Sequence, residues 1–379
     1  MGVRVESESQ KEIDFVLCDC ARKKSTGENG VSKNKKESEK FKMRIKMIVA
    51  IEDIAYSKLV SDNISEVHAD AIDISICNSI EIMTEMLSKR NYDVALVDAV
   101  FVGEMDMNAV NMPLLLWSES DCSADIPEDI ELIRKHQRTS SLIAAVFEQY
   151  AKVSRPGRNM GFGNANITAV WSPAGGVGKT SVAIAYALSH VAAGKDVFYL
   201  NLEDFSSISG HLNVSGKSIS SVFEMLDNQD GDINMLIQGI NCNDRGITYL
   251  CGPDNFEDMS ILSVENVKDL ITACAELTSE LIIDLPCVYD ARTKKALEIA
   301  KRVLIVADRS VTSDLKLTQF VSQNNVFESV EKKVTFIANK DAIFNKPFAE
   351  SVIRLPFVQS SDERLVCETL ATVLAGDIF

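Results

Sequence analysis

Residues 172–181 carry the clearest chemical pattern in the chain. They read Ser-Pro-Ala-Gly-Gly-Val-Gly-Lys-Thr-Ser, with glycines at Gly175, Gly176 and Gly178. Glycines allow backbone N–H groups to approach phosphate oxygens closely, and a helix that starts there adds the positive end of its dipole. In such a loop Lys179 reaches the outer phosphates and the Thr180 hydroxyl ligates Mg²⁺. The sequence therefore predicts a phosphate-binding loop.

The flanking residues support this prediction. An apolar run at 167–171 leads into the loop and a helical pattern at 182–193 leads out of it, the order that a strand, loop and helix require. The strictest form of the motif needs a glycine at position 173, where this chain has Pro173, and the variant GGxGK[ST] fits better. A glycine-rich turn with a chance lysine is the alternative, and the flanking elements disfavour it.

Three later apolar runs end in polar residues that suit the same kind of site. The run at 197–200 leads into Asn201-Leu202-Glu203, and the run at 281–283 ends at Asp284, before Leu285-Pro286. A run at 334–338 ends at Asn339-Lys340. A carboxylate at position 284 suits an Mg²⁺ contact beside Thr180. We predict that these strands lie in one parallel sheet with the loop.

A second α/β pattern occupies residues 44–153. Apolar runs at 45–51, 71–77, 92–98, 113–117 and 130–133 alternate with helical patterns, which predicts another parallel sheet covered on both faces. The carboxyl ends of parallel strands converge on one crevice. The polar residues at these ends are Glu52, Asp53, Asp98, Ser118 and Lys135.

The predicted fold class is α/β, with two doubly wound parallel-sheet domains. We assign residues 1–43 to a disordered polar arm with lysine clusters, 44–153 to the first domain, 154–166 to a glycine- and proline-rich linker, and 167–379 to the nucleotide domain. We expect the linker to let the two domains reorient.

Composition restricts the function classes. The net charge of −16 disfavours nonspecific DNA binding and anionic membranes. The nine cysteines lack paired CxxC spacing, which indicates reduced thiols in a cytoplasmic protein. The two cysteines of Cys18-Asp19-Cys20, in the arm, are a weak indication of a metal-binding site. No apolar run of about 18 residues occurs, so we expect neither a membrane span nor a standard signal peptide.

The order of motifs after residue 167 resembles the MinD/ParA family of P-loop ATPases. The resemblance implies ATP with Mg²⁺ and an ATP-sandwich homodimer. It implies that residues 175–181 (Gly175, Gly176, Val177, Gly178, Lys179, Thr180 and Ser181) hold phosphates, that Thr180 and Asp284 hold the metal, and that Asn339, Pro356 and Phe357 surround the base. Lys179 and Glu203 are then the candidate catalytic residues.

Departures from this family pattern predict tight ATP binding with slow hydrolysis. Ala174 stands where the family has a lysine that crosses to the partner's nucleotide, so a positive charge opposite the transferring phosphoryl group is missing. Asn201 and Glu203 replace a family Asp-x-Asp. Asparagine cannot act as a base, and the Glu203 carboxylate lies one methylene further out. We therefore expect at most a weak ATPase.

The N-terminal domain resembles an atypical response-regulator receiver. The resemblance implies that Asp98 is the phosphoacceptor, that Glu52 and Asp53 bind Mg²⁺, and that Ser118 and Lys135 contact the phosphoryl group. The segment between strands four and five, 120–128, is too short for the usual crossover helix. A degenerate scaffold that only docks partners is the alternative.

Together, the two domains resemble the TadZ/CpaE pilus-assembly proteins. This resemblance implies a cytoplasmic hub, recruited to a cell pole, that binds a second copy of itself and the machinery of a Tad-type pilus or secretion system. It implies that the protein binds no specific nucleic acid and does not insert directly into a membrane. Alternatives are a partition or positioning ATPase for another cargo, and a phosphorylation-controlled response regulator with an ATPase output domain. A reductase with a metal cluster at Cys287 is a further alternative, which the usual role of a single cysteine as a small buried hydrophobe disfavours.

Overall fold

The computed structural model describes residues 44–69, 71–118, 130–154, 164–214, 216–229, 231–343 and 352–378. The expected arm at 1–43, most of the expected linker at 154–166 and the segment at 120–128 lie outside these residues. The described part belongs to one unit, Lys42–Phe379.

The N-terminal domain is a parallel sheet with helices on both faces. Within the described ranges the strand order is β2-β1-β3-β4-β5, which is the flavodoxin-type order of doubly wound sheets. The strands are β1 (Ile45–Ala50), β2 (Ile72–Cys77), β3 (Tyr92–Asp98), β4 (Val110–Trp117) and β5 (Glu131–Arg134). The helices are α1 (Ile54–Val67), α2 (Ile80–Lys89), α3 (Ala99–Val102), the 3₁₀ turn η1 (Met107–Ala109) and α4 (Thr139–Val153).

Local sequence explains these elements. Residues of α1 and α4 pack in one core on one face of the sheet, and residues of α2 and α3 pack in another core. Strands buried on both faces need near-continuous apolar runs, as in β3. The Asp53 side chain accepts hydrogen bonds from the N–H groups of Ala55 and Tyr56, and so it caps α1. Ser79 caps α2 in the same way.

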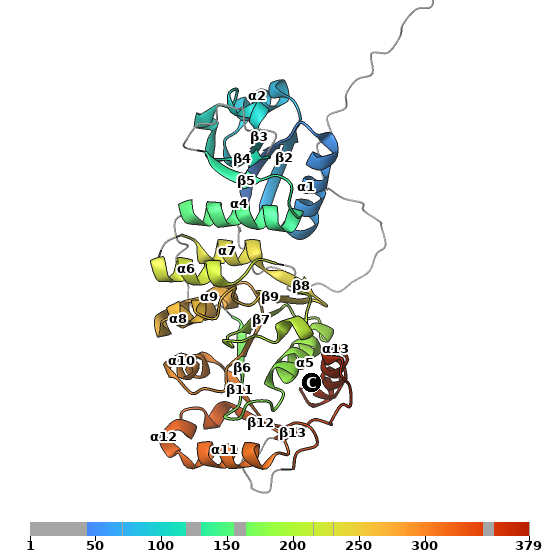
Figure 1. Cartoon of the computed structure of the whole chain (residues 1–379), viewed down its shortest axis with the longest axis vertical. Helices are drawn as coiled ribbons and strands as arrows, with labels where there is room; N and C mark the ends of the chain where they lie inside the picture. The colour runs from blue at the N-terminus through green and yellow to red at the C-terminus, as the bar shows by residue number, and fades with distance from the viewer. Residues whose placement is uncertain are drawn as a thin grey trace, which may run out of the picture. The chain divides into compact units, whose positions relative to one another are not determined.

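The second sheet is larger. Among the described residues it has eight strands in the order β13-β12-β11-β6-β10-β7-β9-β8 (Figure 1). They are β6 (Asn166–Trp171), β7 (Val197–Asn201), β8 (Cys242–Asp244), β9 (Ile247–Tyr249), β10 (Glu280–Asp284), β11 (Arg302–Ala307), β12 (Val334–Ala338) and β13 (Val352–Arg354). The longer helices are α5 (Lys179–Ala192), α6 (Ser220–Asn228), α7 (Ile233–Ile240), α9 (Val264–Glu276), α10 (Ala291–Ile299), α11 (Val311–Ser322) and α13 (Glu363–Ile378). Short pieces are η3 (Ile208–Gly210), α8 (Asp258–Ile261), α12 (Asn324–Phe327) and η4 (Glu331–Lys333).

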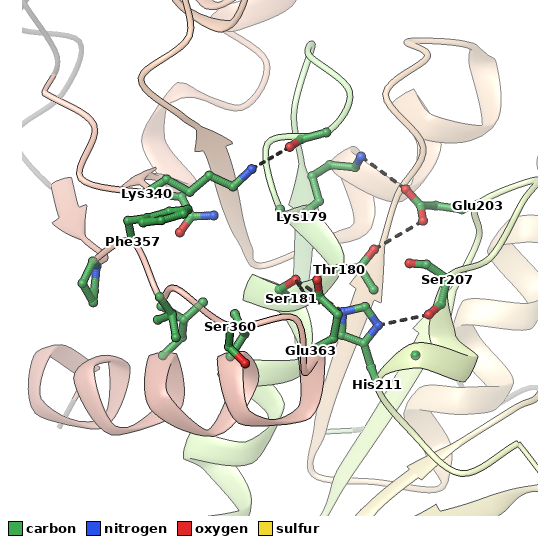
Figure 2. Close-up of a pocket in the computed structure, with 18 residues that line it drawn as sticks. Lys179, Thr180, Ser181, Glu203, Ser207, His211, Lys340, Phe357, Ser360 and Glu363 are labelled. Atoms are coloured by element: carbon green, nitrogen blue, oxygen red, sulfur yellow. Dashed lines mark hydrogen bonds and ion pairs between the residues drawn. The ribbon is translucent and has the colours of Figure 1, made fainter.

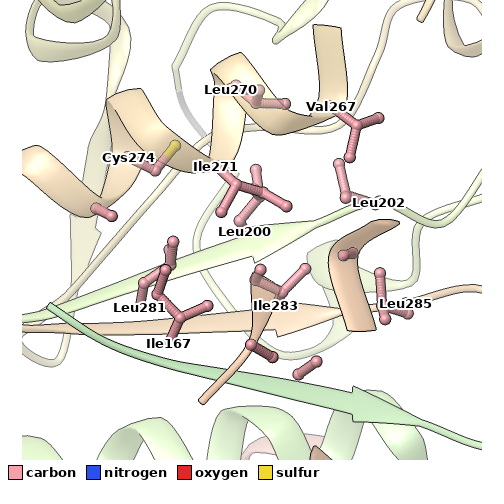
Figure 3. Close-up of a cluster of buried hydrophobic side chains, with 14 of the residues drawn as sticks. Ile167, Leu200, Leu202, Val267, Leu270, Ile271, Cys274, Leu281, Ile283 and Leu285 are labelled. Carbon is pink, nitrogen blue, oxygen red and sulfur yellow. The ribbon is translucent and has the colours of Figure 1, made fainter. Parts of the chain in front are cut away.

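Two cores enclose this sheet. On one face, Ile167, Leu281 and Ile283 pack toward Leu270 and Ile271 of α9 (Figure 3). On the other face, α5 packs against the strands, and α13 lies beside α5 (Figure 1). Side chains from both faces of the strands are thus removed from water, which accounts for the apolar runs in the sequence.

The prediction of a parallel sheet is right for the strands that carry motifs and wrong at one edge. β8 pairs with β9 in the antiparallel direction. The reason is local: β8 and β9 are joined by a tight turn at Arg245-Gly246, and Gly246 has φ 81°. A two-residue turn can join only antiparallel strands.

Helix α4 of the first domain contributes to the core of the second. Ala144 and Ala151 belong to the same buried cluster as residues of α7. A Cβ added to Gly239 of α7 would lie 2.1 Å from the Phe147 Cβ, so the two helices are in close contact. Lys217 Nζ also lies 2.6 Å from Glu148 Oε2.

Candidate nucleotide site

The loop between β6 and α5 has the conformation that its glycines allow. Gly176 and Gly178 have φ values of 74° and 89°, in the left-handed region. A Cβ on Gly178 would also lie 2.6 Å from Asn339 Nδ2. Helix α5 begins at Lys179, inside the motif and three residues earlier than the apolar pattern alone predicted. The loop therefore places the N-terminus of a helix of 14 residues at the site.

A cavity of about 500 Å³ lies at this loop. Its walls come from the loop, the end of β7, the η3 turn, the end of β12, the 356–360 segment and α13. The lining residues are Gly176, Gly178, Lys179, Thr180, Ser181, Glu203, Ser207, Gly210, His211, Asn339, Lys340, Pro356, Phe357, Val358, Ser360, Glu363, Val366 and Leu370 (Figure 2).

Most of the residues predicted from sequence line this cavity. Gly175 and Val177 belong to the loop without lining it, and the Val177 side chain is buried. Asp284 does not line the cavity either, since it is fully buried at the end of β10. The register pairs Asp284 with Val170 of β6 and with Asn201 of β7, which places these strand ends side by side.

Asp284 is held in a buried polar network. Its Oδ2 accepts a hydrogen bond of 2.9 Å from the Tyr199 hydroxyl, and the Asn201 amide also donates to it, at 3.4 Å. Burial raises the pKa of Asp284 to about 7, and the negative charge of Glu203 adds to this, while Thr180, Lys179 and Tyr199 act in the opposite direction.

The second carboxylate oxygen, Oδ1, is buried and accepts no hydrogen bond of normal geometry among the described residues, although the Thr180 hydroxyl is close enough to lower the pKa of the carboxyl. An unpaired buried oxygen is costly, and a divalent cation or its bound water would satisfy it. The donor set of Asp284 Oδ1 and the Thr180 hydroxyl therefore fits Mg²⁺. When bound, the ion would neutralise phosphate charge.

Asn339 fits an adenine base. Its Nδ2 donates a 2.8 Å hydrogen bond to the Val177 carbonyl, which fixes the orientation of the amide. Its Oδ1 is buried and accepts no hydrogen bond within the described part of the chain. An adenine amino group is a donor that matches this acceptor, whereas guanine presents a carbonyl oxygen at that position. Next to it, Lys340 Nζ donates to the Gly176 carbonyl at 2.8 Å.

Phe357 and Arg309 supply an aromatic wall. The Phe357 ring lines the cavity and is 48% exposed, and the Arg309 guanidinium lies 5.5 Å from its centroid. One ring face is thus covered by a cation, a favourable arrangement for an aromatic ring.

Ala174, at the position of the missing lysine, points into the protein. Its side chain is 2% exposed and packs in the core with Val177 and residues of α5. Its N–H donates to the Ser172 hydroxyl at 3.1 Å. No cation therefore projects from this position of the loop.

The cavity also contains residues that sequence reasoning missed, among them His211 and Glu363. His211 Nε2 lies 3.3 Å from the Ser181 hydroxyl and 3.4 Å from Glu363 Oε2, and its Nδ1 lies 3.0 Å from the Ser207 carbonyl (Figure 2). Residue 211 follows no recognisable motif, and Glu363 is the first residue of α13, separated from Ser181 by 182 positions. Nothing in the sequence signals their proximity.

The polar residues of the first domain form a separate cluster. Lys135 Nζ lies 2.7 Å from Asp98 Oδ1, and the Glu52 N–H donates to Asp98 Oδ2 at 3.1 Å. The Asp98 side chain is 8% exposed. Asp53 uses its carboxylate to cap α1, and Ser118 is buried at the end of β4. The structure thus brings the Asp98 and Lys135 side chains together, whereas Glu52 contacts Asp98 only through its backbone N–H.

Two other kinds of site are absent from the described residues. No cluster of three or more His, Cys, Asp or Glu side chains there has the arrangement of a metal site. No helix among them combines the length and apolarity that crossing a membrane requires.

No protein-family model and no curated protein sequence matches the chain. Similar solved structures include a ParA family ATPase from Chlorobium tepidum, with 18% identity and a TM-score of 0.47 over 56% of this chain and 97% of that one. MinD from Pyrococcus horikoshii with Mg-ADP has 14% identity and a TM-score of 0.44 over 56% of this chain and 96% of its own. A plasmid partition protein from Borrelia burgdorferi has 16% identity and a TM-score of 0.42, over 57% of this chain and 100% of its own.

Proposed function

We propose that this protein binds ATP with Mg²⁺ and works as a MinD/ParA-type positioning protein. One observation supports this most directly. The cavity at the phosphate-binding loop joins Lys179 and Thr180 to Asn339, and the buried unpaired oxygens of Asn339 and Asp284 match an adenine amino group and a hydrated Mg²⁺.

We propose that hydrolysis is weak. Ala174 is buried where a catalytic cation would be needed, and Asn201 is occupied in hydrogen bonds with Tyr199, Asp284 and the Glu203 N–H. Glu203 is then the carboxylate available to orient water. A preorganised cation opposite the transferring phosphoryl group can accelerate hydrolysis by orders of magnitude, so a site without one should turn over slowly.

We further propose that the protein is a hub for a Tad-type pilus or secretion system. The pairing of a flavodoxin-type domain with a domain that carries a phosphate-binding loop supports this role. Partners would be a second copy of the chain and proteins of the secretion machinery, at a cell pole. Positioning of another cargo is the alternative.

Nucleotide binding is tested by calorimetry and sedimentation with and without ATP–Mg²⁺. Wild type should bind ATP and dimerise with it, and Lys179→Ala should do neither. Lys195→Ala, at an exposed lysine outside the cavity, is the matched control and should behave as wild type. Failure of wild type to bind ATP would refute the proposal. Dimerisation without nucleotide would show that ATP is a structural ligand.

The hub role needs its own experiment. Affinity capture of the wild-type protein from cells should recover the secretion ATPase of a Tad system, and Lys179→Ala should recover less of it. Recovery of chromosomal DNA-binding partners instead, with a gel shift in the presence of ATP, would favour a partition ATPase.

Phosphorylation at Asp98 is a second candidate function, because Asp98 lies between Lys135 and the Glu52 N–H. Intact-mass analysis after incubation with acetyl phosphate and Mg²⁺ should show one added phosphoryl group, absent in Asp98→Asn. An unchanged mass would leave the cluster as a structural ion pair.

A further inference from the structure

The Glu203 carboxylate contacts both key side chains of the phosphate-binding loop. Glu203 Oε1 lies 3.2 Å from Lys179 Nζ, and Oε2 accepts a 3.3 Å hydrogen bond from the Thr180 hydroxyl (Figure 2). The Lys179 and Glu203 side chains are only 7% and 19% exposed. This is a largely buried ion pair at the centre of the site.

Both contacts involve groups that a nucleotide needs. In a phosphate-binding loop the lysine reaches the β- and γ-phosphates, and the Ser/Thr hydroxyl ligates Mg²⁺. A carboxylate presents two oxygens to these groups, much as one edge of a phosphate does. Glu203 therefore cannot keep these contacts when a Mg²⁺-triphosphate is bound.

We propose that Glu203 is a specificity-determining residue that makes the site favour a nucleoside triphosphate with Mg²⁺ over the corresponding diphosphate. This inference rests on the proposed nucleotide binding. A buried lysine that loses its ion-pair partner is strongly disfavoured unless another anion replaces it. The γ-phosphate is that replacement, and Mg²⁺ offers the released carboxylate a new cation.

A diphosphate replaces these contacts less completely. The backbone N–H groups of the loop hold the α- and β-phosphates, so a diphosphate leaves the γ-position empty and Glu203 still competes for Lys179. The β-phosphate then lies near a carboxylate of the same charge, which is unfavourable. Glu203 thus weakens diphosphate binding more than triphosphate binding.

Calorimetry of ATP and ADP, each with Mg²⁺, tests the proposal on the full chain. Glu203→Gln keeps the shape of the side chain and removes its charge. We expect ADP to bind at least about tenfold more tightly to this variant than to wild type, because the ion pair between Glu203 and Lys179 no longer competes with the diphosphate. The dissociation constant of ATP should change much less. Asp204→Asn, at the adjacent carboxylate, is the matched control and should keep the wild-type ratio of the two dissociation constants.

The outcomes are distinguishable. If Glu203→Gln binds both nucleotides with the wild-type ratio of dissociation constants, the inference is wrong and the proposed function stands. This includes the case in which both nucleotides bind more tightly by the same factor. If wild type binds no adenine nucleotide, the proposed function itself is wrong. Glu203→Asp keeps the charge and shortens the side chain, so it provides a second test if Glu203→Gln does not fold. Its ratio of the ADP and ATP dissociation constants should lie between the wild-type ratio and that of a protein in which residue 203 no longer disfavours ADP. A ratio for Glu203→Asp equal to that of wild type would contradict the inference.

Discussion

Replacement of Asp284 by asparagine tests the electrostatics of the site most directly. The carboxyl is fully buried, and its pKa is raised from 3.8 to about 7 by burial and by the charge of Glu203. Its proton is therefore held more tightly in the folded protein than in the unfolded chain. Below pH 4 both states are protonated, and the carboxyl favours neither. As pH rises from about 4 to 7, the unfolded chain ionises first, so the free energy of unfolding falls.

The size of this effect follows from the shift in pKa. The rise in the pKa of Asp284 from 3.8 to about 7 corresponds to about 4 kcal/mol, at 1.36 kcal/mol for each tenfold change in the acid dissociation constant. Between pH 4 and pH 8, the free energy of unfolding of wild type should therefore fall by up to about 4 kcal/mol more than that of Asp284→Asn.

Urea denaturation at several pH values is the assay. The chain has two tryptophans, Trp117 and Trp171, and Trp171 lies in β6 next to the phosphate-binding loop. A Trp117→Phe background makes the fluorescence report on the second sheet alone. Equal slopes of the unfolding free energy against pH in wild type and Asp284→Asn would refute the reasoning. In parallel, ATP–Mg²⁺ binding to wild type should release a proton at pH 6 and less at pH 8, measured by calorimetry in buffers of different ionisation enthalpy.

Three further predictions concern the base, the loop and the contact between the two domains. Asn339→Ala should weaken ATP binding about tenfold and reduce the preference for ATP over GTP, because the variant loses the acceptor of the adenine amino group; unchanged discrimination in competition binding would place the base elsewhere. Ala174→Lys should lower the thermal midpoint without raising ATP turnover, because position 174 is buried; a large rise in turnover would mean that the loop can turn this side chain outward. Gly239→Val should destabilise the protein by about 1–3 kcal/mol, because Phe147 occupies the space of the added side chain; Gly103→Val, with no atom within 4 Å of an added Cβ, is the control in urea denaturation.

The parts of this protein whose chemistry is local can be predicted from the amino-acid sequence. A phosphate-binding loop is specified by consecutive residues, since its glycines set the backbone and its lysine and threonine follow at fixed spacing. Strands buried on both faces are visible as apolar runs, and β3 begins and ends where the run at 92–98 does. The ends of such strands in a parallel sheet must converge, which is why the sequence pattern alone points to Asp284, Asn339 and Asp98.

How these residues interact with one another depends on the tertiary structure. The distances of Glu203 from Lys179 and Thr180 depend on the β6, β10 and β7 registers and on the loop after β7. His211 and Glu363 reach the cavity from segments with no motif of their own. The stretch between 202 and 280 carries helices α6 to α9 and the antiparallel β8–β9 pair, and its pattern is too irregular to assign. Contacts between residues far apart in the chain depend on packing, and a pattern of neighbouring residues carries no record of them.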